Sequence, residues 1–325
     1  MRKPVGFLMS ALVIAAAYFI YQNVHLRNTG PGGAGRAGSP ATSQTSSQLP
    51  PARASDTIRI ASFNLQVFGE TKMSKPHVVD LLARIVRQFD IVAVQEVNAR
   101  SQDILPLFVD HINATGGYYD YVIGPRLGRT DSKEQYAIIF DRASVEVDRH
   151  QLYTVEDVND QLHREPLVAW FRARGSAANE AFTFSLVDMH VDPDLVAQEV
   201  NALDDVFLAV RNDGRDEDDV ILLGDFNADD RHLGQLGQLS NLMAVVSRMP
   251  TNTRGTAQLD NLLFDQQATT EFTGRGGVFD FLREYNLTVD EALEISDHLP
   301  VWAEFSVFEG GTPGRFANRP GTSRR

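Results

Sequence analysis

The sequence predicts an α/β (α+β) fold in which two packed sheets are covered by helices. Between residues 57 and 308, apolar strand-like segments alternate with helix-like segments, and the strands outnumber the helices. Such a pattern favours sheet layers with helices outside them over one parallel sheet. Because 43% of the 325 residues are hydrophobic and 22% are charged, the chain can bury a sizeable core.

Each expected strand is a short apolar or alternating run that ends near a turn residue. These runs are 57–64, 91–96, 119–124, 136–140, 167–172, 182–189, 220–223, 258–263 and 299–306. Helices are expected at 76–88, 101–114, 194–210 and around 280–285. In the helix at 194–210, apolar side chains recur at helical spacing and predict one buried face: Val196, Val200, Leu203, Phe207 and Val210.

The N-terminal segment, residues 1–27, has the features of a membrane-targeting sequence. Arg2 and Lys3 precede an apolar run from Val5 to Tyr21, about the shortest length that can span a bilayer. Because no small-residue cleavage pattern follows the run, we expect a signal anchor, with a cleaved signal peptide as the alternative. The basic end is then expected to stay in the cytoplasm.

The remaining segments complete the expected domain organisation. Residues 28–56 are rich in Gly, Ser, Pro, Thr and Ala, which predicts a flexible linker, and residues 309–325 are expected to be a disordered basic tail. The domain at 57–308 would therefore lie outside the cytoplasm. It would be anchored to the membrane through the N-terminal helix, in the periplasm or at the cell surface, or secreted if the segment is cleaved.

Charge and cysteine content limit the kinds of partner and site. The net charge of −13 argues against broad electrostatic binding to nucleic acid, so such a surface would have to be local and bridged by cations. The chain has no cysteine, which excludes disulfides, thiolate metal sites and cysteine nucleophiles. Nothing in the sequence indicates a protein partner.

Two short strings contain the most informative polar residues. Asp225 and Asn227 directly follow an apolar strand, and Asp297 and His298 directly precede another. A carboxylate can bind a hard cation or orient water, and an amide can donate a hydrogen bond to a phosphate oxygen. The alternative for the first string is an ordinary turn stabilised by Asx hydrogen bonds.

Other acids, amides and imidazoles lie on or near further strands. Asn64 and Glu96 are each unremarkable when taken alone. His190 and His298, at two strand ends, favour acid–base chemistry near neutral pH over the structural role usual for a single imidazole. Asp260 has apolar neighbours and is expected to pair with an imidazole, whose tautomer it would fix. Together these residues predict a metal-assisted phosphodiester hydrolase.

These strings, in this order, resemble the endonuclease/exonuclease/phosphatase superfamily and, within it, the deoxyribonuclease I family. The resemblance runs through most of residues 57–306 and includes segments without obvious chemistry, such as 68–74, 127–129 and 133–136. It implies a deoxyribonuclease I-like, four-layered α/β sandwich of two packed mixed sheets flanked by helices. The site would lie at one end of the paired sheets.

The resemblance implies a metal site and a phosphate site. Glu96 would be the principal metal ligand, helped by Asn64 and Asp297, and Arg164 would bind a phosphate oxygen. Mg²⁺ is the implied metal, with Mn²⁺ as an alternative and a structural Ca²⁺ as a further expectation. Asn64 would also contact the substrate.

Acid–base roles follow from the same resemblance. Asp225 and Asn227 would act on the attacking water and the scissile phosphate. Glu134 would orient His190, and Asp260 would orient His298. The two pairs would supply the general base and the general acid, in an order that the sequence leaves open.

The sequence departs from the deoxyribonuclease I pattern on the DNA-contacting side. Two Arg and two Tyr of that family are replaced by Gln66, Asn98, Ser132 and Leu259. Arg100 and Arg129 are expected to compensate in part for the lost minor-groove contacts. The leading hypothesis is therefore a non-specific endodeoxyribonuclease. The alternatives are a phosphodiesterase for single-stranded nucleic acid or phospholipid head groups, and a non-catalytic surface binding module on the same scaffold.

Overall fold

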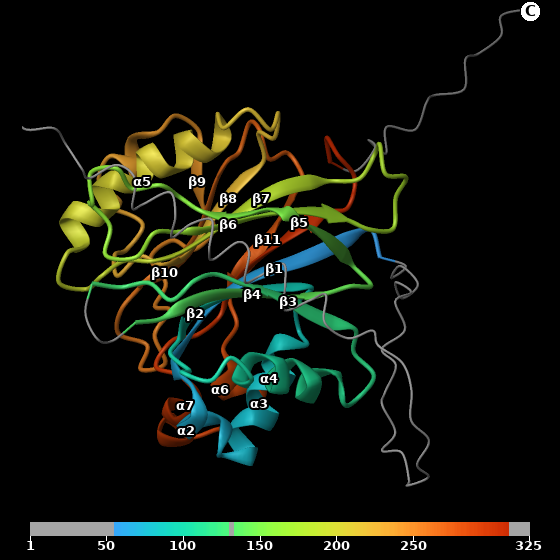
Figure 1. Ribbon diagram of the computed structural model, residues 1–325, viewed down its shortest axis with the longest axis vertical. Helices are drawn as coiled ribbons and strands as arrows, with labels where there is room; N and C mark the ends of the chain where they lie inside the picture. Colours follow the sequence, from blue (N-terminus) through green and yellow to red (C-terminus); the bar gives the residue numbers. More distant parts are fainter. Residues whose placement is uncertain (1–54, 130–132, 312–325) are drawn as a thin grey trace, which may run out of the picture. The chain divides into compact units, whose positions relative to one another are not determined.

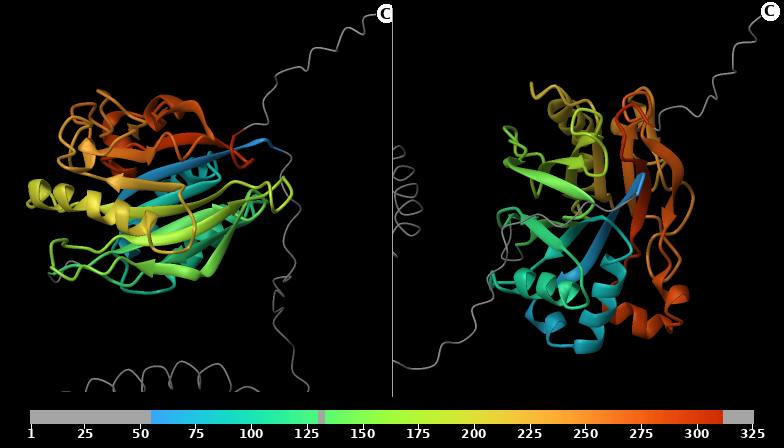
Figure 2. Two further views of the ribbon diagram at one scale, coloured as in Figure 1. Left: turned by 90° about the horizontal axis from the view of Figure 1, so that it is seen from above. Right: turned by 90° about the vertical axis from the view of Figure 1, so that its right-hand side faces the viewer.

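Two six-stranded mixed sheets pack face to face in the computed structural model, with helices on both outer surfaces (Figure 1). The structure describes residues 55–129 and 133–311. Figure 2 shows the same layers from two further directions. The expected four-layered α/β sandwich of two packed sheets is confirmed.

The first sheet has the strand order β11-β12-β1-β2-β4-β3. Only β1 and β2 run parallel in it, and the other neighbours are antiparallel. Its strands are β1 (Thr57–Phe68), β2 (Ile91–Val97), β3 (Tyr119–Ile123), β4 (Gln135–Asp141), β11 (Phe272–Val278) and β12 (Val301–Ser306).

The second sheet repeats this plan with the order β5-β6-β7-β8-β10-β9. Here β7 and β8 form the parallel pair. Its strands are β5 (Val145–Thr154), β6 (Leu167–Ala173), β7 (Thr183–His190), β8 (Val220–Asp225), β9 (Leu242–Ala244) and β10 (Asp260–Asp265). Each sheet therefore has one parallel pair, and the carboxyl ends of both pairs lie at the same end of the sandwich.

The helices divide between the two outer surfaces (Figure 1). One long helix, α5 (Val196–Arg211), covers the second sheet, and its apolar side chains form a core layer with the outer face of β7 and β8. The predicted buried face is confirmed for Val200, Leu203, Phe207 and Val210, whereas Val196 is only partly buried. The first sheet is covered by α3 (Pro76–Val86), α4 (Ile104–Asn113), α6 (Phe281–Glu284) and α7 (Val289–Ile295), while α2 (Glu70–Met73) follows β1 directly.

A third apolar layer fills the space between the sheets. It contains buried β-branched and aromatic side chains from the inner faces of both sheets. The rings of Phe182, Phe184 and Phe305 stack across the interface, with centroids 4.6 Å and 5.8 Å apart for the two pairs that include Phe182. Stacking of this kind adds to the burial of the rings and fixes how the sheets meet.

Some elements were not predicted from the sequence. β5, β9 and β11 are additional strands, and α2 and α7 are additional helices. β5 is a largely half-buried edge strand, and β11 contains three glycines in seven residues, so neither has a clear strand pattern. β1 continues beyond the expected end at residue 64 to Phe68, with a register shift after Asn64.

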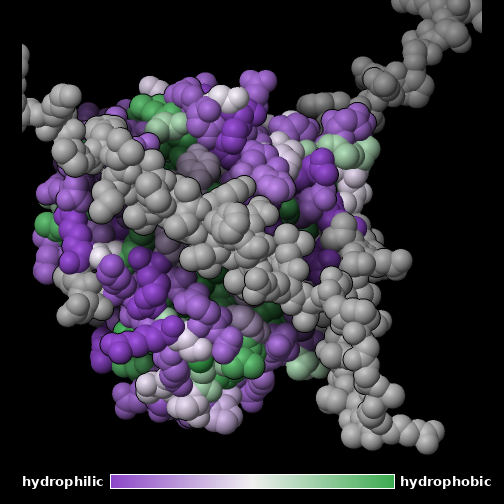
Figure 3. Space-filling model, in the orientation of Figure 1, coloured by the Kyte–Doolittle hydropathy of each residue, from purple (hydrophilic) through white to green (hydrophobic). Residues whose placement is uncertain are grey.

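The expected anchor, linker and basic tail lie almost entirely outside the described residues. Within 55–129 and 133–311, no helix has the length and apolar character that crossing a membrane requires. On the face drawn in Figure 3, hydrophilic side chains predominate and hydrophobic ones form small separate patches. The large exposed hydrophobic residues are likewise scattered along the chain, which is ordinary for a protein surface.

Gly224 provides a test of how tightly β7 and β8 must approach each other beside Asp225. Its φ is +152°, and a Cβ there would overlap the Met189 carbonyl oxygen on the neighbouring strand. We expect Gly224→Ala to lower the free energy of unfolding by about 3 kcal/mol, because overpacked buried positions force the backbone to shift. Urea unfolding would measure the loss.

Gly69→Ala is the matched control. A Cβ at Gly69 would have its nearest neighbours at 3.5 Å, which is ordinary contact. Its effect should stay within about 1 kcal/mol. Equal effects of the two substitutions would contradict the close approach inferred at Gly224.

Candidate active site

Strand register brings the predicted site residues of the second sheet together. The parallel pairing of β7 with β8 sets His190 opposite Asp225, and the antiparallel pairing of β8 with β10 sets Asp260 opposite Asp225. Three chemically active residues from three strands therefore occupy neighbouring positions at one edge. The register of the strand pairs determines this arrangement.

The first sheet adds its residues at the same end. Asn64 lies on β1 beside the end of β2, which carries Glu96. β12 runs antiparallel to β1, so the loop that contains Asp297 and His298 enters beside Asn64. The Ser296 hydroxyl fixes this loop by donating a 2.7 Å hydrogen bond to the Asn64 carbonyl.

The Asp225 carboxylate lies at the centre of the cluster. Its Oδ2 is 3.5 Å from Nε2 of His190 and 3.5 Å from Nε2 of His298. The Asn64 side-chain amide donates to the same oxygen at 3.0 Å. Asp225 is 1% exposed, so this anion depends on its neighbours for solvation. One buried oxygen thus joins both sheets and both imidazoles.

Each imidazole is oriented from behind by a buried carboxylate. Nδ1 of His190 is 2.9 Å from Glu134 Oε1, and Nδ1 of His298 is 2.9 Å from Asp260 Oδ2. The Thr251 hydroxyl donates to Asp260 at 2.7 Å. These contacts bring the predicted pairs together and direct both Nε2 atoms toward Asp225. Nδ1 can then hold a proton while Nε2 remains available for proton transfer.

The electrostatic environment favours charged imidazoles. Burial opposes the charge on His298, but attraction and a hydrogen bond from Asp260 outweigh it and raise the pKa of His298 to about 10. Burial likewise opposes the charge on His190. The hydrogen bond with Glu134 and the attraction of the nearby Asp225 outweigh burial and raise the pKa of His190. Burial raises the pKa of Asp260, although His298 partly counters this.

The predicted metal ligands form a set of hard oxygen donors. Glu96 accepts hydrogen bonds from the Asn64 amide at 3.0 Å and from the Val67 backbone at 2.8 Å, and it is only partly buried. The Asp297 side chain is 47% exposed, and its Oδ1 is 3.9 Å from Nε2 of His298. Accessible carboxylates beside an amide are the donor set that Mg²⁺ or Mn²⁺ accepts, so the residues fit a divalent metal.

A second arrangement at the centre also has metal-ligand character. Ligand atoms of Asp225, Asp260 and His298 all lie within 4.8 Å of one another. The hydrogen bond between Asp260 and His298 accounts for that proximity without an ion. We therefore keep Glu96, Asn64 and Asp297 as the predicted metal ligands.

The backbone is held in an unusual conformation around the site. Non-glycine residues with positive φ include Gln66 at 47°, Val67 at 56°, Glu96 at 61° and Asn227 at 48°. Such conformations cluster at functional sites, where surrounding contacts maintain them. Here the side-chain oxygen of Asn64 accepts a hydrogen bond from the Gln66 backbone amide at 2.9 Å. The Asp225 carboxylate accepts one from the Asn227 backbone amide, also at 2.9 Å.

The three predicted substrate-binding arginines differ in their surroundings. Arg164 is buried and forms a 2.9 Å ion pair with Glu134, so in this structure it supports the His190 pair from behind. Arg129 donates to the Asp160 carboxylate at 2.8 Å. Arg100 is exposed, and among the described residues its hydrogen bond is made by the backbone, with Glu70 at 3.1 Å. Their contacts with substrate stay predictions.

The departures from the deoxyribonuclease I pattern lie around the cluster. Gln66 and Leu259 are partly buried on its two flanks, next to Asn64 and Asp260. Asn98 follows Glu96 by two residues, and its side-chain oxygen is buried without a hydrogen-bond partner among the described residues. Ser132 lies outside the described residues.

Lys72 is a supporting residue that the sequence did not reveal. Its ammonium group donates to the carbonyls of Leu65, Gln66 and Ile295 at 2.6, 2.7 and 2.7 Å. It therefore connects the part of β1 after Asn64 with the end of α7 before Asp297. Burial lowers the pKa of Lys72 to about 8, against attraction from Asp297 and Glu96. Lys72 lies in residues 68–74, a segment that resembles the deoxyribonuclease I family, and this resemblance was the one sign in the sequence that the residue has a role.

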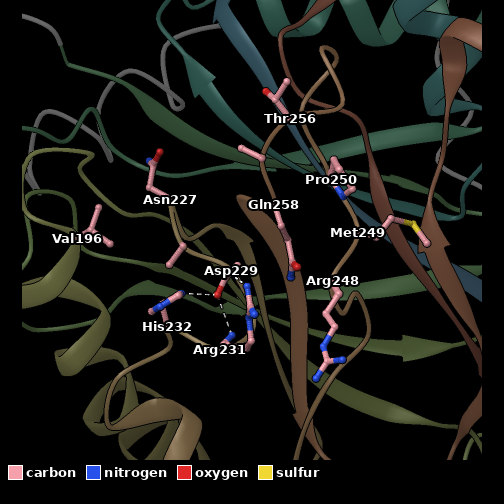
Figure 4. Close-up of a pocket in the computed structure, with 12 residues that line it drawn as sticks. Val196, Asn227, Asp229, Arg231, His232, Arg248, Met249, Pro250, Thr256 and Gln258 are labelled. Atoms are coloured by element: carbon pink, nitrogen blue, oxygen red, sulfur yellow. Dashed lines mark hydrogen bonds and ion pairs between the residues drawn. The ribbon is translucent and has the colours of Figure 1, made fainter.

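An open hollow of about 560 Å³ adjoins the cluster at Asn227 (Figure 4). Three basic side chains line it: Arg231, His232 and Arg248. Asp229 is bound to Arg231 at 3.2 Å and to His232 at 2.6 Å, whereas the exposed Arg248 side chain has no ion-pair partner among the described residues. These residues were not predicted from the sequence, although Arg231 and His232 closely follow Asn227.

Comparisons with known proteins identify the family of the chain. Residues 61–298 match the profile described as the Endonuclease/Exonuclease/phosphatase family. The chain is 30% identical to Deoxyribonuclease gamma of Rattus norvegicus over 262 residues, covering 75% of this chain and 83% of that protein. It is 33% identical to Deoxyribonuclease-1 of Bos taurus over 263 residues, covering 75% and 91%.

Solved structures share the fold at lower sequence identity. A humanized TDP2 from D. rerio has a TM-score of 0.55 and 16% identity, covering 78% of this chain and all of that one. The human Nocturnin catalytic domain has a TM-score of 0.54 and 16% identity, covering 78% and 94%. At this identity, the likeness concerns the fold alone.

The raised pKa of His190 predicts a pH-dependent stability. The charged imidazole stabilises the folded state fully below its ordinary value of 6.5, and this contribution is lost as pH rises through the higher folded pKa. We expect the free energy of unfolding in EDTA to fall as pH increases above about 6.5, with a smaller fall in His190→Gln. Urea unfolding at a series of pH values would measure both.

His150→Gln provides the control, because His150 is exposed and, within residues 55–129 and 133–311, forms a hydrogen bond through its backbone alone. This variant should keep the pH dependence of the unaltered protein. An unchanged slope in His190→Gln would show that Glu134 and Asp225 do not hold a charged His190.

Proposed function

The chain belongs to the Endonuclease/Exonuclease/phosphatase family, and on this basis we propose that it is a divalent-metal-dependent phosphodiester hydrolase acting on DNA as a non-specific endodeoxyribonuclease. The observation that supports this most directly is Asp225 Oδ2, 3.5 Å from Nε2 of both imidazoles. A carboxylate between two carboxylate-backed imidazoles can serve an in-line displacement at phosphorus, which needs a base and an acid.

The residues of the chain perform complementary steps in this proposal. Asp225 orients a water molecule, the imidazole that is neutral accepts its proton at Nε2, and the other, charged imidazole donates a proton from Nε2 to the leaving oxygen. Glu134 and Asp260 hold the two rings during both transfers. A divalent ion, when bound by Glu96, Asn64 and Asp297, would supply charge stabilisation at the phosphate. The order in which His190 and His298 act stays open.

DNA is the substrate that the sequence relatives favour, since their names are those of deoxyribonucleases. The hollow with Arg231 and Arg248 offers cationic side chains for a phosphate backbone in an otherwise acidic chain. Gln66, Asn98 and Leu259 support the alternative of single-stranded nucleic acid or a phospholipid head group. The location outside the cytoplasm and the membrane anchor rest on residues 1–27 and stay predictions.

Plasmid cleavage tests the proposed chemistry. We expect nicking of supercoiled DNA with Mg²⁺ and its loss in EDTA. His190→Ala and His298→Ala should each reduce the cleavage rate by ~10²–10⁴-fold, because positioned acid–base groups contribute that much. The readout is the initial rate from gel analysis of nicked and linear DNA.

His150→Ala is the control at an exposed histidine and should cleave normally. Parallel rates on single-stranded DNA and phospholipid diesters distinguish the substrates. Cleavage of lipid diesters alone would favour the alternative substrate. Inertness on every phosphodiester, with folded protein and added Mg²⁺ or Mn²⁺, would leave only a binding module.

Arg248 tests whether the hollow receives DNA. Arg248→Ala should raise the KM for duplex DNA several-fold, by a smaller factor at higher salt, with little change in kcat, since the side chain is outside the acid–base cluster. Arg149→Ala is the control, because Arg149 pairs with Asp120 away from the hollow. A fall in kcat at constant KM would place Arg248 in a different role.

A further inference from the structure

A buried acid lies on the apolar face of α5. Glu199 comes three residues after Val196 and four before Leu203, so helical spacing places it on the face that packs against the second sheet. The residue is 1% exposed. A buried carboxylate costs free energy unless hydrogen-bond donors surround it. The donors that surround Glu199 therefore indicate its role.

Both carboxylate oxygens of Glu199 accept hydrogen bonds from backbone amides outside the helix. Oε1 accepts from the His163 amide at 2.7 Å, and Oε2 accepts from the Asp192 amide at 2.9 Å. His163 lies in the loop before β6, and Asp192 lies in the loop after β7. One side chain thus joins two loops at the end of the sandwich that carries the reaction centre.

Each bonded amide is close in sequence to a residue of the reaction centre. Arg164 directly follows His163, and His190 lies two residues before Asp192. The Arg164 guanidinium donates to the His190 carbonyl at 3.2 Å. The two loops are therefore joined twice, by the Glu199 carboxylate on one side and by the bond between Arg164 and His190 on the other.

The same two loops hold the first acid–base pair in place. Arg164 forms a 2.9 Å ion pair with Glu134 Oε1, the oxygen that also contacts Nδ1 of His190. The Val191 carbonyl, next to His190, accepts a 2.8 Å hydrogen bond from the Asn227 side chain. A displacement of either loop would therefore move groups that the proposed chemistry requires in fixed positions.

The surroundings of Glu199 support a charged carboxylate there. Burial raises the pKa of Glu199, while the hydrogen bonds from the two backbone amides and the attraction of Arg164 oppose this rise. Glu199 also lies in the first turn of α5, where the helix dipole favours negative charge. The contacts that join the loops are thus the contacts that stabilise the buried charge.

We propose that Glu199 is a positioning residue for phosphodiester hydrolysis, which fixes the loops before β6 and after β7 so that Arg164 and His190 keep their places. This inference rests on the proposed function. Glu199 acts through the two residues rather than on the substrate, because both of its carboxylate oxygens are occupied by backbone amides.

The other end of α5 provides a matched control. Arg211 is the last residue of the helix and forms a 2.9 Å ion pair with Asp265, the last residue of β10. Asp265 is buried and lies at the end of β10 remote from Asp260. Asp265→Asn therefore weakens the attachment of the same helix, far from the reaction centre.

Cleavage kinetics test the positioning role. Glu199→Gln keeps the shape of the side chain but has one acceptor oxygen, so one of the two backbone amides loses its partner. We expect kcat for plasmid DNA to fall by roughly 10- to 100-fold, with a smaller change in KM, because displaced reacting groups cost this much. Asp265→Asn should lower the Tm and leave kcat unchanged. A normal kcat in Glu199→Gln, or an equal loss in Asp265→Asn, would overturn the proposal.

A double variant tests whether Glu199 acts through Arg164. In the Arg164→Ala background, Glu199→Gln should reduce kcat by a smaller factor than in the unaltered protein, because residues of one contact network are not additive. Losses that simply multiply would contradict the proposed route.

NMR of the imidazole nitrogens gives a readout that does not require activity. The His190 signals, assigned by their loss in His190→Gln, should shift in Glu199→Gln and stay in place in Asp265→Asn. Unchanged His190 signals in Glu199→Gln would overturn the positioning role. If the unaltered protein cleaves no phosphodiester while the His190 signals respond as expected, the proposed function fails and the link between Glu199 and His190 stands.

Discussion

The site depends on one buried carboxylate oxygen, Asp225 Oδ2, which contacts groups from both sheets. The Asn64 amide reaches it from the first sheet, and His190 reaches it from the second. A buried anion is tolerated only when donors surround it, so the sheets must pack in one register for Asp225 to be satisfied. The same requirement fixes the distance between the two imidazoles, which no single strand could set.

Much of this arrangement could be predicted from the sequence, because strand pairing places residues at strand ends side by side. The resemblance to the deoxyribonuclease I family implied the pairs of Glu134 with His190 and of Asp260 with His298, and both are present. Side-chain partners that depend on loops were not foreseeable. Arg164 is an example: its string gave no indication that its guanidinium faces Glu134 inside the protein. β11 was not predicted, because its glycines have no side chains that could form an alternating apolar and polar pattern.

The departures from the deoxyribonuclease I pattern lie around the reaction centre and leave the centre itself unchanged, and the structure gives a physical reason. His298, Asp260 and Asp225 are buried and mutually hydrogen-bonded or charge-paired, so replacing one leaves its partners unsatisfied. Gln66 is partly buried, and Arg100 is exposed and has no side-chain hydrogen bond in the described structure. Substrate preference can therefore change at the edge of the cluster without disturbing the acid–base geometry.

The left-handed backbone at Val67 and Glu96 has a consequence for protein engineering. A β-branched residue and a long acid are poorly suited to that conformation, and each such position carries a penalty of order 1–3 kcal/mol. Glycine at Val67 would relieve the penalty and could make the chain more heat-resistant. It would also loosen the backbone amide that holds Glu96 Oε2 at 2.8 Å. Thermostability and catalytic precision therefore oppose each other at this turn, and selection for one is expected to erode the other.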